Sequence, residues 1–323
     1  MSTVSLRATP SYDTEILRPH LEDLLAPLGG MAAIVRPGAR VLLKPNLLNG
    51  TRPAQECTTH PAIIREVARM VCECGGRPFL GDSPAFGSAR GVAKAHGLLP
   101  ICAEFGMPII EFSPGSYRSE GETFDHLRLS KQAMEADVII NLPKVKSHSQ
   151  LTLTLGVKNL FGCVPGKLKA WWHLEAGKDR LRFGKMLVET AATLKPELTI
   201  IDGIIAHEGN GPSNGEPRFL GLLGASRDVF AIDWVFTDIL GVDPDAVPVL
   251  VAARALGIGP TVEDIEVSGI IADLRVPDWK LPDALMPIDF GMPRVIRSTL
   301  KHLYIRFVRE PLASTSPTQQ GIR

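Results

Sequence analysis

The chain has 323 residues, of which 45% are hydrophobic and 22% are charged, and its 35 Lys and Arg residues balance its 35 Asp and Glu residues. This composition is typical of a globular protein with a sizeable core, and the zero net charge argues against a general nucleic-acid binder. No apolar run approaches the ~18 residues of a transmembrane helix. The N-terminus lacks an apolar signal region, so we expect a cytoplasmic protein.

The five cysteines do not form a recognisable framework. Their odd number and their scatter argue against disulfides, and the close pair Cys72 and Cys74 lacks the repeated spacing of an iron–sulfur or zinc site. We therefore expect buried free thiols and no iron–sulfur cluster.

The hydrophobic pattern alternates between short strands and amphipathic helices along the chain. We expect strands at residues 4–8, 40–43, 77–80, 108–112, 126–129, 138–142, 198–205, 219–223 and 265–269. We expect helices at residues 13–25, 61–74, 88–105, 181–194, 228–240 and 247–256. This alternation predicts an α/β fold with a mainly parallel, doubly wound sheet in one or two lobes, and a C-terminal helical extension.

The segment from Asp137 to His173 is the richest in candidate site residues. A buried strand ends at Pro143, which cannot donate to a strand ladder, and a predicted loop then carries Lys144, Lys146, Ser147 and His148. Lys158 follows inside an apolar segment, where a cation is costly unless it is paired or used. The alternative is a solvated basic loop, but that does not explain Lys158.

The C-terminal part divides into two further predicted regions. Beyond a domain at residues 1–270, an extension at 271–311 contains a basic amphipathic helix from Pro293 to Val308, and residues 312–323 resemble a disordered tail. The helix either contacts an acidic membrane surface or packs back on the domain, and we expect the second arrangement.

Several polar loops follow predicted parallel strands, and such strand ends meet where ligands bind in α/β sheets. Cations beside glycine-rich turns suit a phosphate or carboxylate, and histidines suit proton transfer or a transition metal. The candidate substrate-binding residues are Lys44, Asn46, Arg52, Asp82, Lys144, Lys146 and Glu208. The other candidates, with catalytic, cofactor or metal roles, are His148, Lys158 and His173.

Six short motifs and one aspartate resemble the family called domain of unknown function 362, and the match covers about residues 2–270. They are VLLKPN (41–46), THP (59–61), GDSP (81–84), NLPKVKSH (141–148), GVKNLFG (156–162), EGNGP (208–212) and Asp233. Many members of that family carry an appended four-iron ferredoxin segment, and this chain lacks its cysteines. The resemblance therefore implies an α/β domain without a cluster, and the family name assigns no activity.

A more local resemblance connects the chain to the nickel-pincer lactate racemases. Thr51-Arg52-Pro53 matches a Thr-Arg-Pro loop, His148 precedes Lys158 by ten residues, Pro165-Gly166 follows, and His173 comes fifteen residues after Lys158. The resemblance implies that Lys158 anchors a cofactor, His173 binds a metal, His148 transfers a proton and Arg52 contacts a carboxylate. The chain departs from that pattern at Asn49, where the racemases have an acidic residue.

These patterns lead to two hypotheses about function. The first is an isomerase-like enzyme that binds a small anionic substrate at the strand ends, with His148 and Lys158 as catalytic residues. Its cofactor is unknown. One option is a transition metal or metal-containing cofactor held by His173 and Lys158. The second is a non-catalytic cofactor- or metabolite-binding or maturation protein. A structural or nucleic-acid role is disfavoured because the chain has no basic stripe interleaved with aromatic residues. The oligomeric state stays open, and a homodimer is compatible with the sequence.

Overall fold

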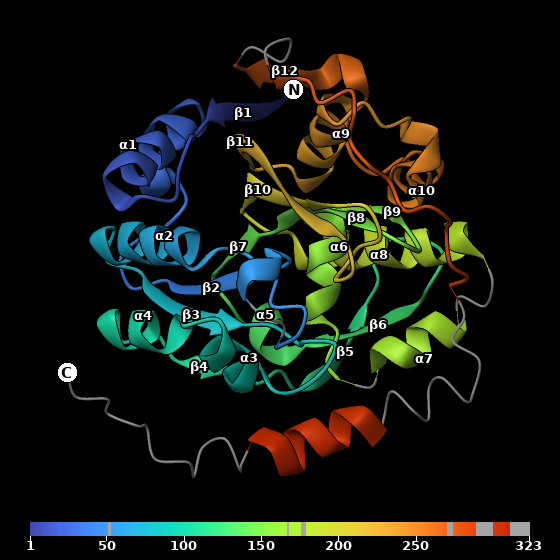
Figure 1. The fold of residues 1–323 in the computed structure, drawn as a ribbon, viewed down its shortest axis with the longest axis horizontal. Coiled ribbons are helices and arrows are strands. Elements are labelled where there is room, and N and C mark those ends of the chain that lie inside the picture. Colours follow the sequence, from blue (N-terminus) through green and yellow to red (C-terminus); the bar gives the residue numbers. More distant parts are fainter. Residues whose placement is uncertain (51–52, 167, 176–178, 270–273, 289–299, 311–323) are drawn as a thin grey trace.

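The computed structural model describes residues 1–50, 53–166, 168–175, 179–269, 274–288 and 300–310. Helices cover both faces of one mixed, mostly parallel sheet of ten strands (Figure 1), which confirms the predicted α/β class. The strands are β1 (Ser2–Ala8), β2 (Arg40–Pro45), β3 (Arg77–Gly81), β4 (Ile109–Ile110), β7 (Val138–Leu142), β8 (Lys144–His148), β9 (Thr152–Thr154), β10 (Leu198–Glu208), β11 (Glu216–Ser226) and β12 (Ile265–Ser268).

The sheet runs in the order β12-β1-β11-β10-β7-β2-β3-β4, and β8 and β9 branch from β10. Strands β10, β7, β2, β3 and β4 pair in parallel, whereas β11 is antiparallel to both β1 and β10. In the β2–β7 register Lys44 lies opposite Asn141. The polar strand ends of β2, β3 and β7 therefore meet at one edge of the sheet, as parallel pairing requires.

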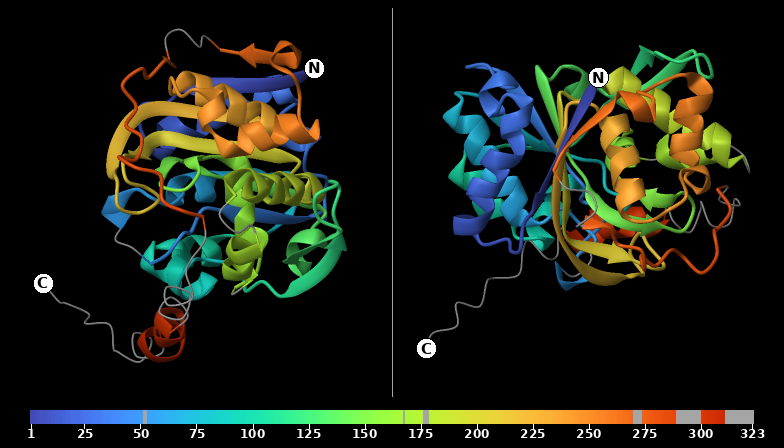
Figure 2. Two further views of the ribbon diagram at one scale, coloured as in Figure 1. Left: turned by 90° about the vertical axis from the view of Figure 1, so that its right-hand side faces the viewer. Right: turned by 90° about the horizontal axis from the view of Figure 1, so that it is seen from above.

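Figure 2 shows the sheet edge-on, with helices in a layer on each side. Alternate strand residues face opposite layers: Leu43 packs in the core under α1 and α2, and Leu42 packs in the core on the other face. The helices are α1 (Thr14–Leu25), α2 (Pro61–Glu73), α3 (Ala89–Ala95), α4 (Leu98–Glu104), α5 (Lys131–Met134), α6 (Gly156–Leu160), α7 (Leu168–Glu175), α8 (Arg180–Leu194), α9 (Val229–Ile239) and α10 (Pro248–Leu256).

Two segments outside the expected strands contain strands. Residues 144–148 form β8 rather than a loop, because Lys144 and Lys146 pair with β10 and β9 pairs with the other side of β8. Pro143 only separates β7 from β8. The polar segment 113–125 contains β5 (Pro114–Arg118), which pairs with β6 (His126–Ser130) as a separate two-stranded sheet. Strand β10 also extends further than expected, to Glu208.

The last described segment, residues 300–310, is helical and includes a π-helical stretch at Ile305–Arg309. The remainder of the expected basic helix and the tail at 312–323 lie outside the described residues, and the proposed division of the chain at residue 270 stays a prediction. Within the described chain, every helix is too short or too polar to span a membrane.

Candidate functional site

The site is centred on a buried ion pair at the ends of β2 and β3. Lys44 Nζ lies 3.0 Å from Asp82 Oδ1, and the two side chains are 0% and 5% exposed. Lys44 Nζ also donates to the carbonyl oxygen of Pro45 at 2.7 Å, and Asp82 Oδ2 accepts the Leu47 backbone N–H at 2.9 Å. These bonds hold the loops after both strands in a fixed arrangement around two desolvated charges.

Helix α6 is attached to this pair through amides. Asn159 Nδ2 donates to the Lys44 carbonyl at 3.2 Å and to Asn141 Oδ1 at 2.8 Å, so it connects the ends of β2 and β7. Asn159 Oδ1 accepts from Asn46 Nδ2 at 3.0 Å. The amides thereby fix the position of Lys158, which precedes Asn159 on α6.

The start of α6 is held by a buried carboxylate. Asp233 on α9 accepts the backbone N–H groups of Gly156 at 2.7 Å and Val157 at 3.0 Å, which satisfies two of the free donors at a helix start. Burial raises the pKa of Asp233 to about 7, and the two backbone donors oppose that rise. The family motif residue Asp233 therefore positions the helix that carries Lys158.

Two more lysines join Lys44 at this edge of the sheet. Lys146 on β8 is 1% exposed, and its ammonium donates to Asn46 Oδ1 at 2.9 Å and to the Cys57 carbonyl at 2.8 Å. Lys169 on α7 donates to the carbonyl oxygen of Ser83, directly after Asp82. We refer to Lys44, Lys146, Lys158 and Lys169 as the lysine cluster.

Gly162 allows these groups to come together. A Cβ atom at this position would lie 2.0 Å from Asp82 Oδ1 and 2.5 Å from Lys44 Nζ, well inside contact distance. The Gly162 carbonyl also accepts the Ser83 backbone N–H at 2.9 Å. Any larger residue would displace the buried ion pair.

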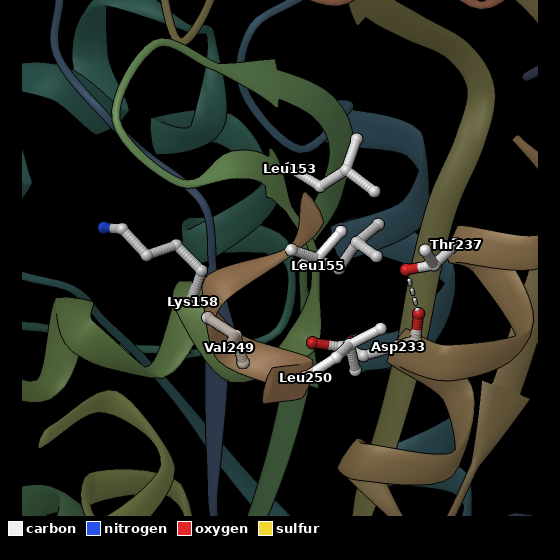
Figure 3. A pocket seen from close by; sticks show the side chains of 8 residues that line it. Leu153, Leu155, Lys158, Asp233, Thr237, Val249 and Leu250 are labelled. Atoms are coloured by element: carbon white, nitrogen blue, oxygen red, sulfur yellow. Dashed lines mark hydrogen bonds between the residues drawn. The ribbon is translucent and has the colours of Figure 1, made fainter. Parts of the chain in front are cut away.

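Lys158 has different surroundings from the other three lysines. Within the described part of the chain its ammonium makes no hydrogen bond or ion pair, and it lies 4.8 Å from the centre of the Phe161 ring. Figure 3 shows its stem beside Leu155 and Val249 and its ammonium pointing away from them. The cavity beside the stem measures about 10 Å³ and is lined mainly by leucine and valine, so it has room for at most one water and does not serve as the ligand site.

Burial and the neighbouring positive charges lower the pKa values of three lysines in the cluster. Desolvation is the largest cause that lowers the pKa of Lys158, to about 7, and the positive charge of Lys169 is the next. Desolvation similarly lowers the pKa of Lys146 and of Lys169 to about 8. The negative charge of Asp82 opposes all three shifts, but one carboxylate does not balance four amines. A bound anion would relieve this imbalance.

His148 lies within electrostatic reach of the cluster, and His173 lies within reach of His148. Desolvation lowers the pKa of His148 well below its usual value, followed by the charges of Lys158, Lys146 and His173. His148 Nδ1 accepts the Gln150 backbone N–H at 3.1 Å, which places the proton of the neutral ring on Nε2. His148 is therefore a neutral hydrogen-bond donor in this arrangement, and a base only after losing its contact to Gln150.

The predicted metal role of His173 does not fit the surrounding donors. Its ring is stacked on Phe183 with centroids 4.4 Å apart, and its Nδ1 lies 3.2 Å from the Ile288 carbonyl. Across the described ranges, no group of three His, Cys, Asp or Glu side chains is arranged to hold a metal ion. We therefore derive no chemical step through a metal.

Two predicted residues, Lys144 and Glu208, stand apart from the cluster. Lys144 is paired with Asp202 at 3.1 Å and with Glu56 at 3.3 Å. Glu208 is paired with Arg218 at 3.0 Å. Arg52 lies outside the described residues. The lysine cluster thus lies beside Asn46, Asp82 and His148, whereas Lys144 belongs to a neighbouring network.

Sequence reasoning gave no site role to Lys169, Asn159 or Asp202. Asn159 lies in the GVKNLFG motif, and Lys169 follows the Pro-Gly turn, so both were within the central segment. Asp202 interrupts the apolar run LTIIDGII, and a carboxylate inside a buried strand is itself a signal that it has a partner.

Comparisons with known proteins found a family model, a sequence relative and a solved structure. A family model described as "Domain of unknown function (DUF362)" matches residues 41–238. The thylakoid-associated protein sll1697 of Synechocystis sp. (strain ATCC 27184 / PCC 6803 / Kazusa) is 59% identical over 313 residues, covering 97% of this chain and 98% of that protein. A solved structure of the lactate racemase apoprotein from Thermoanaerobacterium thermosaccharolyticum resembles the fold with a TM-score of 0.47 and 12% identity, over 71% of this chain and 56% of the racemase.

Proposed function

This chain belongs to the family described as Domain of unknown function (DUF362), and because that description assigns no activity, we propose a function from the site itself. We propose that the chain is an isomerase-like enzyme, which binds a small anionic substrate at the lysine cluster and removes and returns a proton of that substrate. The observation that carries this proposal is the position of Lys158: its ammonium makes no hydrogen bond or ion pair among the described residues and lies 4.8 Å from the centre of the Phe161 ring. Desolvation and the neighbouring lysines lower its pKa to about 7. Lysines of lowered pKa act as bases near neutral pH.

The surrounding groups suit a carboxylate or phosphate ligand. The ammonium groups of Lys44, Lys146 and Lys169 supply positive charge in a site of low dielectric, where it acts strongly on an anion. A substrate with a C–H bond next to a carbonyl or carboxylate would lose that proton to Lys158 Nζ. The electron pair would move onto the substrate oxygen, where the lysines and the His148 N–H stabilise it. Return of the proton completes an isomerisation without any redox partner.

The 59% identical relative is named for its association with thylakoids. We propose that this chain too works at a membrane surface, as a peripheral protein on the cytoplasmic side. The absence of a spanning helix from the described residues is compatible with that arrangement.

Covalent labelling tests the anion site and its reactive amine together. Pyridoxal phosphate carries an anionic group and an aldehyde; a neutral amine adds to the aldehyde, water leaves, and borohydride reduces the imine to a stable secondary amine. At pH 7 we expect labelling of Lys158 in preference to the exposed Lys195, whose side chain is 69% exposed, with protection by inorganic phosphate. Peptide mass spectrometry identifies the labelled lysine, and equal labelling of both would contradict the proposal.

The catalytic part requires a second readout. In D₂O, the protein should exchange deuterium into the carbon next to the carbonyl of at least one small 2-oxo or 2-hydroxy acid, as followed by proton NMR, and Lys158→Met should not. Selective labelling without exchange on any acid of the panel would reject the enzyme and leave the second hypothesis, a protein that binds a metabolite or cofactor.

A further inference from the structure

The helical segment at residues 300–310 exposes a continuous apolar stripe. Leu300, Tyr304, Phe307 and Val308 are 62%, 59%, 67% and 41% exposed. Their spacing of four, three and one residues places them on one face of a helix. The segment crosses one end of the molecule, below α3 and β4 in Figure 1.

Cations border this stripe. Lys301, Arg306 and Arg309 are all exposed, whereas the acidic residue of the segment, Glu310, is turned toward the domain. An aromatic and aliphatic face bordered by Lys and Arg is the composition that lies flat in the headgroup region of an anionic bilayer.

The opposite face of the segment is attached to the α/β domain. Glu310 Oε1 accepts the Ser88 backbone N–H at 2.9 Å, and Glu310 Oε2 accepts the Ser88 hydroxyl at 2.7 Å. Lys301 Nζ lies 4.8 Å from the centre of the Phe86 ring. The helix therefore packs on the domain through one face. Its outer face, which carries the apolar stripe, is not covered by any of the described residues.

This attachment connects the helix to the site. Phe86 and Ser88 belong to the loop that leaves β3. The same loop begins with Asp82 and Ser83, which contact Lys44 and Lys169 of the lysine cluster. A surface bound by the outer face of the helix would thus lie across the helix from this loop.

We propose that residues 300–310 dock the protein on an anionic lipid bilayer, with Tyr304 and Phe307 entering the headgroup region and Arg306 and Arg309 binding lipid phosphates. This inference deepens the proposed membrane association by naming its surface and its lipid chemistry, and it rests on exposure and charge rather than on the relative. Charge complementarity selects an anionic lipid over a neutral one, since each Lys or Arg near such a surface contributes about 1 kcal/mol.

Vesicle sedimentation of the full chain tests the proposal. Vesicles of phosphatidylcholine with phosphatidylglycerol should bind the protein, pure phosphatidylcholine vesicles should bind it weakly, and added salt should reduce the difference. The double variant Tyr304→Ser, Phe307→Ser should bind the anionic vesicles at least about tenfold more weakly. Arg306→Gln with Arg309→Gln should lower binding to them about thirtyfold, with little change on neutral vesicles.

Phe219→Ser provides a matched control, because Phe219 is an equally exposed aromatic residue, 62% accessible, on β11. It should bind vesicles as the wild type does. Unchanged binding by the Tyr304/Phe307 variant would overturn the role of the helix while leaving membrane association intact through another surface. Binding to native membranes but to no lipid vesicle would indicate a protein partner and would overturn the lipid inference. Binding to neither would reject both.

Discussion

Lys158→Met should lower the affinity for sulfate at pH 7 by about tenfold to a hundredfold, as measured by isothermal titration calorimetry. The methionine keeps the apolar stem that packs beside Leu155 and Val249 (Figure 3) but removes the charge. Hydrogen bonds to a charged group contribute about 1.5–3 kcal/mol, which corresponds to the stated loss. Sulfate is a suitable probe because its charge is constant near neutral pH.

The fold should tolerate this substitution. Lys158 is a desolvated cation among like charges, so its removal relieves repulsion and should leave the unfolding midpoint unchanged or raised. Lys195→Met, at a lysine whose side chain is 69% exposed, is the matched control and should bind sulfate normally. If Lys158→Met bound sulfate as tightly as the wild type, Lys158 would not belong to the anion site.

Asp202→Ala should lower the free energy of unfolding by about 3–5 kcal/mol, because it leaves a fully buried lysine without its principal partner. Asp202 and Lys144 are both 0% exposed and lie 3.1 Å apart. The Asp202 carboxylate also accepts the Tyr12 hydroxyl at 2.6 Å and the His60 backbone N–H at 2.9 Å. One substitution therefore removes an ion pair and two hydrogen bonds that join β10 and β8 to the segments before α1 and α2.

Urea unfolding followed by circular dichroism measures this loss. Asp238→Ala is the appropriate control: Asp238 pairs with Arg275 at 3.3 Å with side chains 32% and 62% exposed, and such pairs contribute at most about 1 kcal/mol. Equal effects of the two substitutions would show that the Lys144–Asp202 network does not stabilise the fold as described.

The sequence predicted the α/β class because its strands and helices differ in hydrophobic period and because their ends carry local signals. Asp13 and Asp228 are placed before helices and do accept the first backbone N–H groups of α1 and α9. Strand β8 was missed because Lys144, Lys146 and His148 are polar residues in an extended segment. Their burial is decided by long-range pairing with β10, which no local pattern encodes.

The difference between local patterns and long-range pairing also explains how far the site could be predicted. Lys158 was identified because a cation inside an apolar segment is costly wherever the segment lies. Lys144 was assigned to the site by its proximity to Lys146, but its partner Asp202 is 58 residues away in sequence, so its separate network could not be foreseen. The tautomer of His148 depends on one backbone contact, and only the folded structure provides that contact.

The low pKa of Lys158 has two consequences of opposite sign. Between about pH 7 and 10.5 the unfolded chain binds a proton at Lys158 that the anion-free folded protein has lost, so this group makes the free energy of unfolding rise with pH in that window. Sulfate binding requires the protonated amine, so affinity should fall as the pH rises through 7. Sulfate should thus raise the unfolding temperature more at pH 6 than at pH 9.

The most direct test of the anion site is the pKa of Lys158 itself, followed by carbon NMR on protein labelled at the lysine ε-carbon and assigned with Lys158→Met. We predict a pKa of about 7 without ligand and an increase of at least about one unit in saturating sulfate, because a bound anion favours the charged amine. A pKa near 10.5 that sulfate leaves unchanged would contradict the lysine cluster as a binding site for anions.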